Sequence, residues 1–351
     1  MLLLLIAAIL LAFLAQWYLL EHGLDRVHFS QHTAGNLVEP EVPFTVYTTL
    51  ENRKKFLPVL LQVQERLPEE LTILGRVENS RVSLYRVRYY EYCQYLRRCA
   101  KVQRSYQAAL PARGRYMFRG AVLKGNDFFG TQESTLQVDG EIEMVVLPKR
   151  LDVIALEEML GGFLGDVSVR RYIMEDPTLH TGFRDYTGRE PMRAISWSQS
   201  AKGQGLMVKQ YDHTTDPVIT LLLSVAGGTP EELEVCFSMV RTICETLEEK
   251  HIRYDFFTNA IMVNAPRASR HVGEGLGAQH LNTILEGLGR STYHSAEPLH
   301  RMLYRASERV NETSCLVILP HADTTAQAEI QRFFAHTSGM LRLITAQEVL
   351  S

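Results

Sequence analysis

The chain has 351 residues, 46% of them hydrophobic, and a formal net charge of −3. This length suits two folded domains of ordinary size, and the apolar fraction excludes a largely disordered protein. The near-neutral charge excludes a global field that recruits nucleic acid or acidic partners.

The first feature along the chain is an apolar segment, Leu2 to Leu20, which has no charged side chain. As a helix it is just long enough to cross a hydrocarbon core of about 30 Å. Trp17 and Tyr18 lie at its end, where amphipathic rings favour the membrane interface. We interpret residues 1–20 as a single-pass anchor; the alternative, a secretory signal peptide, would need a basic start that is missing. Residues 21–37 are predicted to be a polar linker.

Residues 38–150 contain short segments of alternating residues, which are typical of half-buried β-strands separated by turns. This pattern predicts an Ig-like antiparallel β-sandwich. The expected strands are Phe44–Thr49, Val59–Val63, Val82–Tyr95, Val102–Leu110, Met117–Leu123 and Glu141–Leu147.

The stretch from Arg81 to Arg119 is rich in arginine and tyrosine. Basic groups beside stacking rings suit a surface that binds single-stranded nucleic acid. We prefer a plainer interpretation, in which arginines lie on a wet face and tyrosines are half buried, because no recognisable binding motif accompanies the charge. A basic surface directed at anionic lipid is a further alternative, since the anchor would hold this domain near a membrane.

The remainder of the chain changes character twice. Leu151–Gly161 has the apolar spacing of a helix, and an irregular segment, Asp166 to Gly203, follows. Strands and helices then alternate, which predicts a mainly parallel sheet with helices on both faces. The expected strands are Leu206–Tyr211, Val218–Leu223, Arg253–Val263, Ser314–Leu319 and Met340–Ile344. The expected helices are Thr229–Lys250, His280–Leu288, Ala296–Val310 and Thr325–His336. The fold class is therefore α+β and multidomain, with a family-signature segment at 151–212 and an α/β domain at 213–351.

The five cysteines, Cys93, Cys99, Cys236, Cys244 and Cys315, form no metal-type spacing and are odd in number. This favours reduced, buried thiols over a disulfide framework. We therefore expect the soluble body to lie on the cytoplasmic side of the membrane that holds the anchor.

Two stretches of sequence resemble bacterial proteins of domain-of-unknown-function family 58. The first, Ala112 to Gly130 with Met144 to Asp152, is similar to that family's Arg-Gly-x-Tyr, Asp-Pro-Phe-Gly and Val-x-Pro pattern. The second, Phe183 to Asp212, is similar to the family signature and is the more specific of the two. Its matching residues are Arg184, Tyr186, Gly188, Arg193, Ile195, Trp197, Ser200, Ala201, Lys202, Leu206, Val208 and Lys209. The family's Gly-Asp-Asp turn is replaced here by Gly188-Arg189-Glu190.

A third stretch, Val218 to Gly228, resembles the first strand of a von Willebrand A-type domain, which ends in a cation-binding Asp-x-Ser-x-Ser. Here Ser224, Ala226 and Gly228 occupy those three positions. The resemblances together imply a membrane-tethered protein with a sandwich and a von Willebrand A-like domain, working with a MoxR-type AAA+ ATPase. They imply an architecture and a partner, and no reaction.

The signature has two interpretations. In the first, Arg193 and Trp197 share one face of an extended segment and form a cation–π clamp, with Tyr186 and Trp197 buried. In the second, a partner or an anion docks on the basic residues. These are Arg184, Arg189, Arg193, Lys202 and Lys209. We favour the clamp for Arg193 and Trp197, and binding for Arg189 and Lys202, which lie in turns flanked by glycine.

We predict no metal site at Ser224, Ala226 and Gly228, where the metal motif would lie. Mg²⁺ prefers oxygen ligands with at least one carboxylate, whereas Ser224 offers a neutral hydroxyl. Asp212, Asp216 and Asp255 remain candidate replacements, although no spacing brings them near. The helix start after Gly227-Gly228 has backbone N–H groups that suit a partner's carboxylate, but a tight turn is the simpler explanation.

Enzyme motifs are absent from the sequence: there is no G-x-S-x-G elbow and no H-E-x-x-H. The glycine-rich stretch Gly273 to His280 lacks a Walker lysine and is expected to be a mobile loop. We therefore expect a non-enzymatic adaptor without cofactor or metal. The alternatives are a metal-dependent adhesion module with rearranged ligands and a cryptic hydrolase at the sheet edge.

Overall fold

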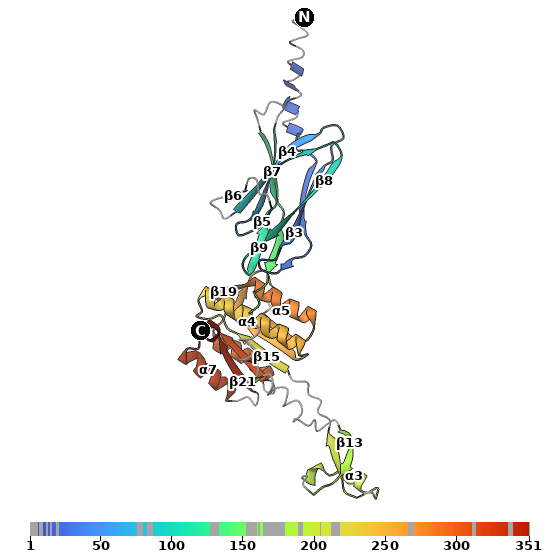
Figure 1. Cartoon of the computed structure of the whole chain (residues 1–351), viewed down its shortest axis with the longest axis vertical. Helices are drawn as coiled ribbons and strands as arrows, with labels where there is room; N and C mark the ends of the chain where they lie inside the picture. Colours follow the sequence, from blue (N-terminus) through green and yellow to red (C-terminus); the bar gives the residue numbers. More distant parts are fainter. Residues whose placement is uncertain are drawn as a thin grey trace. The chain divides into compact units, whose positions relative to one another are not determined.

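The computed structural model describes residues 6, 10–11, 13–14, 16–18, 21–75, 80–82, 87–126, 133–151, 160, 162–163, 180–188, 192–203, 205–211, 218–265, 270–310, 314–335 and 340–350. The chain divides into two compact units, Met1–Lys149 and Arg150–Ser351. Figure 1 shows the strands of the first unit in blue and green and the α/β elements of the second in yellow to red.

The first unit is a β-sandwich-like body in which the strands pair antiparallel, except for the parallel pair of β2 with β12. Its larger sheets have the strand orders β1-β3-β8-β5 and β11-β10-β4-β7-β6, and a third sheet has the order β2-β12-β9. The strands are β1 (Val27–Thr33), β2 (Leu37–Val38), β3 (Phe44–Asn52), β4 (Val59–Pro68), β5 (Thr72–Leu74), β6 (Ser80–Val82), β7 (Val87–Leu96), β8 (Ala100–Ala109), β9 (Gly114–Phe118), β10 (Ala121–Asn126), β11 (Glu133–Val138) and β12 (Ile142–Val146).

Alternation along β4 explains why this segment forms a strand. Val59, Leu61, Val63, Glu65 and Leu67 are buried, and the residues that alternate with them are more exposed. This period of two places one row of apolar side chains in the core and the other row toward solvent. The expected strand is therefore confirmed, and it is longer than predicted because it continues to Pro68.

The predicted polar linker at 21–37 is wrong from Val27 to Thr33, which forms strand β1. Strand β1 pairs with β3 in an antiparallel register from Val27↔Asn52 to Thr33↔Val46. Leu24, Val27 and Phe29 are buried in the sandwich core. Hydrogen bonding to β3 and this burial outweigh the polar composition of the segment.

A buried carboxylate connects the two larger sheets of the sandwich. Glu65 on β4 is fully buried and accepts hydrogen bonds from Tyr92 Oη at 2.8 Å and Tyr106 Oη at 2.9 Å. It also accepts from Gln31 Nε2 at 2.8 Å and Thr48 Oγ1 at 3.0 Å. The donors come from β1, β3 and β8 of one sheet and from β7 of the other, so the carboxylate joins both sheets.

The arginine- and tyrosine-rich strands have half-buried tyrosines, as expected. Tyr90, Tyr92 and Tyr106 lie partly buried against the core. Arg104 differs from the expectation, since its guanidinium stacks over the Tyr92 ring at 4.2 Å and does not lie on the wet face. The arginine therefore covers a buried ring.

More than half of the expected anchor, residues 1–20, lies outside the described residues. Within the part of the chain that the structure describes, no helix has both the length and the apolar character needed to cross a membrane.

The second unit contains a five-stranded sheet of order β18-β16-β15-β20-β21. The strands β15 (Val218–Leu223), β16 (Arg253–Thr258), β20 (Ser314–Leu319) and β21 (Leu341–Thr345) are parallel, and β18 (His271–Gly275) is an antiparallel edge strand. A small sheet pairs β17 (Ala260–Met262) with β19 (Ser291–Ser295). The helices are α4 (Pro230–Glu249), α5 (Ala278–Arg290), α6 (Leu299–Val310), α7 (Thr324–Phe334) and α8 (Ala346–Leu350).

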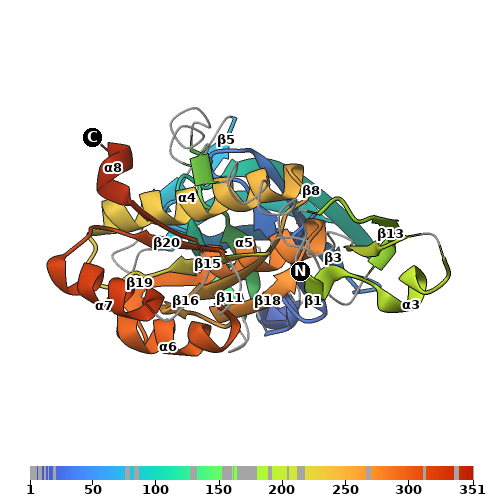
Figure 2. The same ribbon diagram turned by 90° about the horizontal axis from the view of Figure 1, so that it is seen from below.

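Helices cover both faces of this sheet, as the alternating pattern predicted. Met302 and Leu303 of α6 and Ile330 of α7 pack in one core cluster with Leu222 and Val317 of the sheet. Figure 2 shows α4 on the other side of β15 and β20 from α6 and α7. The buried strands lack alternation because both of their faces are covered.

Residues 180–211 include most of the segment that resembles the family signature, and the chain was expected to be irregular from Asp166 to Gly203. Their described part contains β13 (His180–Asp185), a 3₁₀ turn η1 (Met192–Ala194), α3 (Trp197–Ser200) and β14 (Met207–Tyr211). Strands β13 and β14 form a separate two-stranded antiparallel sheet. The prediction that Leu206–Tyr211 is a strand of the α/β sheet is therefore wrong. The expected helix Leu151–Gly161 lies largely outside the described residues.

The cysteines are all free. Cys236, Cys244 and Cys315 are buried, as expected, whereas Cys93 and Cys99 are exposed, which corrects the expectation that all five are buried. Burial raises the pKa of Cys236 to about 12 and raises that of Cys244 further. Both buried thiols therefore stay protonated near neutral pH.

Candidate functional site

The carboxyl edge of the α/β sheet is the first candidate site. The strand order places β15, the first strand of the sheet in the chain, between β16 and β20. Open sheets of this kind bind ligands at the carboxyl ends of the strands where the order reverses. That point lies between β15 and β20, where Ser224 and His321 follow the two strands.

Ser224, which the sequence resemblance aligns with the first position of a von Willebrand A-type metal motif, has a hydroxyl that is already engaged. The side chain is 1% exposed, and its Oγ accepts from Asn259 Nδ2 at 3.0 Å and from Ala226 N at 3.4 Å. A hydroxyl has two acceptor lone pairs. The arrangement is therefore a closed, neutral hydrogen-bond network.

Asn259 is the centre of this network and was missed in the sequence. Its Oδ1 accepts from Val225 N at 2.9 Å, and its Nδ2 also donates to Glu297 O at 3.1 Å. Its backbone carbonyl accepts from Ala296 N at 2.7 Å. The residue directly follows β16, so its position at the end of a buried parallel strand was the signal that pointed to it.

The glycine pair after β15 is required by close packing. Gly227 has a φ of +78°, in the left-handed region that favours glycine. A Cβ at Gly228 would lie 2.7 Å from Pro320 Cβ and 2.8 Å from Leu233 Cδ2. The tight strand-to-helix turn that the sequence favoured is thus supported by both positions.

We expect Gly228→Ala to lower the free energy of unfolding of the second unit by about 1–3 kcal/mol, because the added methyl overpacks the turn. Hydrogen exchange of the α4 and β15 amides measures the loss. Gly273→Ala is the matched control, since a Cβ there meets nothing within 4 Å. Equal exchange in both variants would contradict the packing argument.

The amino end of α4 already has its own carboxylate. Thr229 Oγ1 accepts from Glu232 N at 3.3 Å, and Glu232 Oε2 accepts from Thr229 N at 2.9 Å, which is a capping box. The hydrogen bond from the Thr229 backbone holds the pKa of Glu232 below its ordinary value. The cap occupies backbone donors that a partner's carboxylate would need.

A polar group borders this turn. His321 Nε2 lies 3.3 Å from Asp323 Oδ1, and its Nδ1 lies 3.9 Å from Glu232 Oε2. Across the described ranges, no three His, Cys, Asp or Glu side chains gather in a way that suits a metal ion. Of the candidate replacement ligands, Asp212 and Asp216 lie outside the described residues, and Asp255 is buried within β16.

The signature residues form the second candidate site, on the β13–β14 module (residues 180–211). Ile195 and Val208 are buried and joined by a bridge, and Ser200 Oγ accepts from Met207 N at 2.9 Å while donating to Ser196 O at 2.8 Å. These three matches therefore hold the module together. Gly188 has a φ of +86° in the connecting turn.

Other signature side chains are directed to solvent. Arg184, Lys202 and Lys209 are exposed and Tyr186 is half buried. Arg189 lies outside the described residues, and so does the side chain of Arg193. The structure thus brings exposed cations and signature turns onto one small module.

The predicted burial of Trp197 is wrong. Its side chain is 58% exposed, close to Met192 in the sequence, which is 68% exposed. The clamp assumed an extended segment, but Met192–Ala194 is a 3₁₀ turn and Trp197 begins α3. The indole therefore has no extended strand on which to share a face with Arg193.

The glycine-rich stretch Gly273 to His280 also differs from expectation. It comprises the end of β18 and the start of α5, and Gly277 N donates to both carboxylate oxygens of Glu248 at 2.8 and 2.9 Å. His280 Nε2 lies 3.0 Å from Tyr254 O, and burial lowers the pKa of this imidazole. These contacts explain why the stretch from Gly273 to His280 has a defined conformation and is not the loop that we expected.

No protein family and no curated protein matches the chain. Solved structures that match include a cohesin module from a Clostridium perfringens family 33 glycoside hydrolase, with 10% identity over 34% of this chain and 96% of that one, and a TM-score of 0.26. A non-cellulosomal cohesin from Archaeoglobus fulgidus has 8% identity over 34% and 91%, with a TM-score of 0.24. A type I cohesin–dockerin complex from Clostridium thermocellum has 13% identity over 34% and 99%, with a TM-score of 0.24. The description of the fold therefore rests on the chain's own strand topology.

Proposed function

We propose that this chain is a membrane-anchored, non-enzymatic adaptor of the domain-of-unknown-function 58 type that docks a MoxR-type AAA+ ATPase. The exposure of the signature residues on the β13–β14 module is the observation that carries the proposal. Trp197 is 58% exposed, and Lys202 and Lys209 are directed to solvent. Tryptophan is typical of the residues that dominate protein interfaces, and exposed cations around such an anchor steer a partner of opposite charge.

The α/β domain supports the same proposal as a von Willebrand A-like scaffold. Its chain-ordered strands have the spatial order three-two-one-four-five, with β18 as an antiparallel edge. At the position of the degenerate metal motif, Asn259 engages the Ser224 hydroxyl. The proposed recognition of a protein therefore does not depend on a cation bridge.

The membrane part of the proposal rests on the sequence. Leu2 to Leu20 has no charged side chain and one strongly polar residue, Gln16, and Trp17 and Tyr18 lie near its end, where a spanning helix would reach the interface. Such an anchor would place the sandwich beside the bilayer and leave the module available to a soluble ATPase.

Co-purification of the full chain with a MoxR-type ATPase tests the docking. We expect the pair Trp197→Ala and Lys202→Glu to lower recovery of the ATPase by about tenfold or more, because a central tryptophan contributes about 2 kcal/mol or more to an interface. Tyr304→Ala with Lys250→Glu is the matched control, since Tyr304 is 74% exposed and Lys250 is exposed on α4's end. Unchanged recovery with the first pair would remove the module from the interface.

A further inference from the structure

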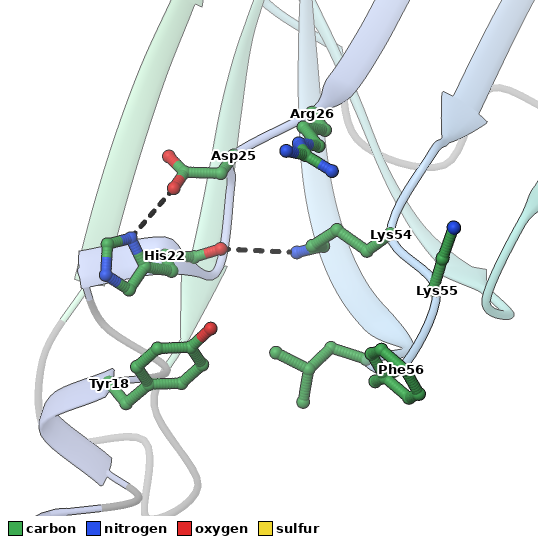
Figure 3. A pocket seen from close by; sticks show the side chains of 8 residues that line it. Tyr18, His22, Asp25, Arg26, Lys54, Lys55 and Phe56 are labelled. Carbon is green, nitrogen blue, oxygen red and sulfur yellow. Dashed lines mark hydrogen bonds and ion pairs between the residues drawn. The ribbon is translucent and has the colours of Figure 1, made fainter.

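A pocket lies where the apolar amino-terminal segment joins the sandwich. Its volume is about 310 Å³, and its lining comes from the end of the segment and from the loop between β3 and β4. The lining residues are Tyr18, His22, Asp25, Arg26, Lys54, Lys55, Phe56 and Leu57. Figure 3 shows Lys54 reaching across to the carbonyl of His22, with Tyr18 and Phe56 on one side of it and Arg26 on the other.

Lys54 sets the geometry of this junction. Its ammonium donates to Gly23 O and, at 3.4 Å, to His22 O, and the residue is only 8% exposed. Arg53 N donates to Arg26 O at 3.1 Å, which fixes the same loop to the start of β1. The exit of the apolar segment is therefore held against the β3–β4 loop.

Asn52 connects this loop to the neighbouring turn between β7 and β8. It is fully buried, and its Nδ2 donates to Leu57 O at 2.9 Å and to Arg97 O at 3.1 Å. Cys99 N donates to Lys54 O at 3.1 Å. The two loops and the end of the segment thus form one end of the sandwich, which we call the basic end (residues 21–26, 51–58 and 97–99).

The basic end has an excess of positive charge and one protruding ring. Its six cations outnumber its three carboxylates. The cations are Arg26, Arg53, Lys54, Lys55, Arg97 and Arg98, and the carboxylates are Glu21, Asp25 and Glu51. Two of the carboxylates are paired, Asp25 with His22 at 2.8 Å and Glu51 with Arg53 at 2.9 Å. Phe56 is 85% exposed beside these charges.

Cations beside an exposed aromatic ring suit the surface of an anionic bilayer. Basic residues close to a membrane-spanning segment are attracted to anionic headgroups, and amphipathic or aromatic side chains enter the interface. Here the apolar segment, the ring of Phe56 and the uncompensated cations all occur at the same end of one unit. The basic end directly follows the apolar segment in the chain. If that segment spans a membrane, the basic end lies at the membrane surface, so lipid headgroups are favoured over a protein partner as its occupant.

We propose that the basic end binds the phosphate of an anionic phospholipid headgroup through Arg26 and Lys55, with Phe56 inserted at the acyl boundary. This deepens the proposed membrane anchoring and rests on it. Lys54 acts as a positioning residue, because its ammonium donates to the carbonyls of His22 and Gly23. The bound lipid would fix the sandwich against the membrane and limit its rotation about the anchor.

The experiment uses the full chain in proteoliposomes of phosphatidylcholine alone or of an equal mixture with phosphatidylglycerol. Hydrogen exchange of the amides at 53–57 is measured in both. We expect exchange to slow by at least about fivefold in the anionic vesicles, because each of the two cations near the surface contributes about 1 kcal/mol. The double variant Arg26→Glu with Lys55→Glu should lose this protection. Lys149→Glu is the control, since Lys149 is exposed and lies outside the basic end.

Two further arms separate the possible failures. Retention on phosphatidylcholine vesicles after an alkaline wash tests the anchor alone. If the chain washes off but anionic vesicles still bind it through Arg26 and Lys55, the anchor is wrong and the headgroup site stands. Equal exchange in the two vesicle types overturns the headgroup site whether or not the anchor holds. The second arm adds free glycerol phosphate to the phosphatidylcholine vesicles. If this slows exchange at residues 53–57 as much as the anionic vesicles do, the headgroup site is also overturned, because the site would then bind a soluble phosphate.

Discussion

Replacing Glu65 with alanine is expected to lower the free energy of unfolding of the first unit by about 3–5 kcal/mol. The substitution removes the acceptor of four donors, among them the largely buried hydroxyls of Tyr92 and Tyr106. Each buried donor left without a partner costs about 1–3 kcal/mol. Because the donors come from both larger sheets, the loss also weakens the contact between the sheets.

Hydrogen exchange of the β4 and β7 amides in the full chain measures this loss without unfolding the second unit. Glu70→Ala is the matched control: Glu70 is exposed in the turn after β4, and its removal should change the free energy by less than about 0.5 kcal/mol. A Glu65 variant that exchanges like the control would show that the buried network contributes little.

The same carboxyl predicts a pH dependence. Burial raises the pKa of Glu65 above its ordinary value of 4.5, against the opposing effect of its hydrogen bonds. The folded state then binds the proton more tightly than the unfolded state, so this stabilisation is complete below pH 4.5 and is lost as the pH rises through the folded pKa. Glu65→Gln cannot titrate, and the difference between the two proteins should therefore vary with pH in that window. A constant difference would contradict the raised pKa.

The second large effect is expected at Asn259, where alanine should lower the free energy of unfolding of the second unit by about 2–4 kcal/mol. The change leaves Val225 N and Glu297 O without the amide that joins them, and Ser224 Oγ without its closer partner. All three groups lie at the carboxyl edge of the sheet. Exchange of the β15 and β16 amides reports the loss.

Gln279→Ala provides the control for Asn259, because Gln279 is an exposed amide on α5. Adding Mg²⁺ to the wild-type chain should leave the β15 amides unchanged, since the Ser224 hydroxyl is engaged by Asn259 and Ala226. Protection by Mg²⁺ would favour the metal-dependent alternative and would require a different function for the domain.

The strands and helices with regular periodicity were predictable, and the failures have identifiable causes. Strand β1 was not predicted because Gln31 donates to the buried Glu65. A polar residue thus occupies a core-facing position and interrupts the apolar alternation by which a strand is recognised. A sequence shows a polar residue in such a place without showing its partner, which is 34 residues away. Local pattern therefore understates strands whose inward side chains serve a buried carboxylate.

At the candidate sites, too, features formed by neighbouring residues were predictable from the sequence, and contacts between distant residues were not. The glycine turn after β15 was predictable from the residues in it, whereas the contact of Asn259 with Ser224 joins residues 35 positions apart. The prediction for the signature segment failed for a different reason. Alternation from Arg193 to Trp197 suggested an extended chain, but Trp197–Ser200 is helical, and Ser200 Oγ donates to Ser196 O within that turn. A side chain bonding to the backbone competed with the strand pattern.

The distribution of thiols gives the protein an internal reporter. Cys93 and Cys99 are open to solvent in the first unit, and the three cysteines of the second unit are buried. A maleimide added to the native chain should therefore label only the sandwich. Labels on Cys236, Cys244 and Cys315 would appear only when the α/β unit opens, so peptide mapping after a brief exposure would tell which half of the molecule comes apart first under heat or denaturant.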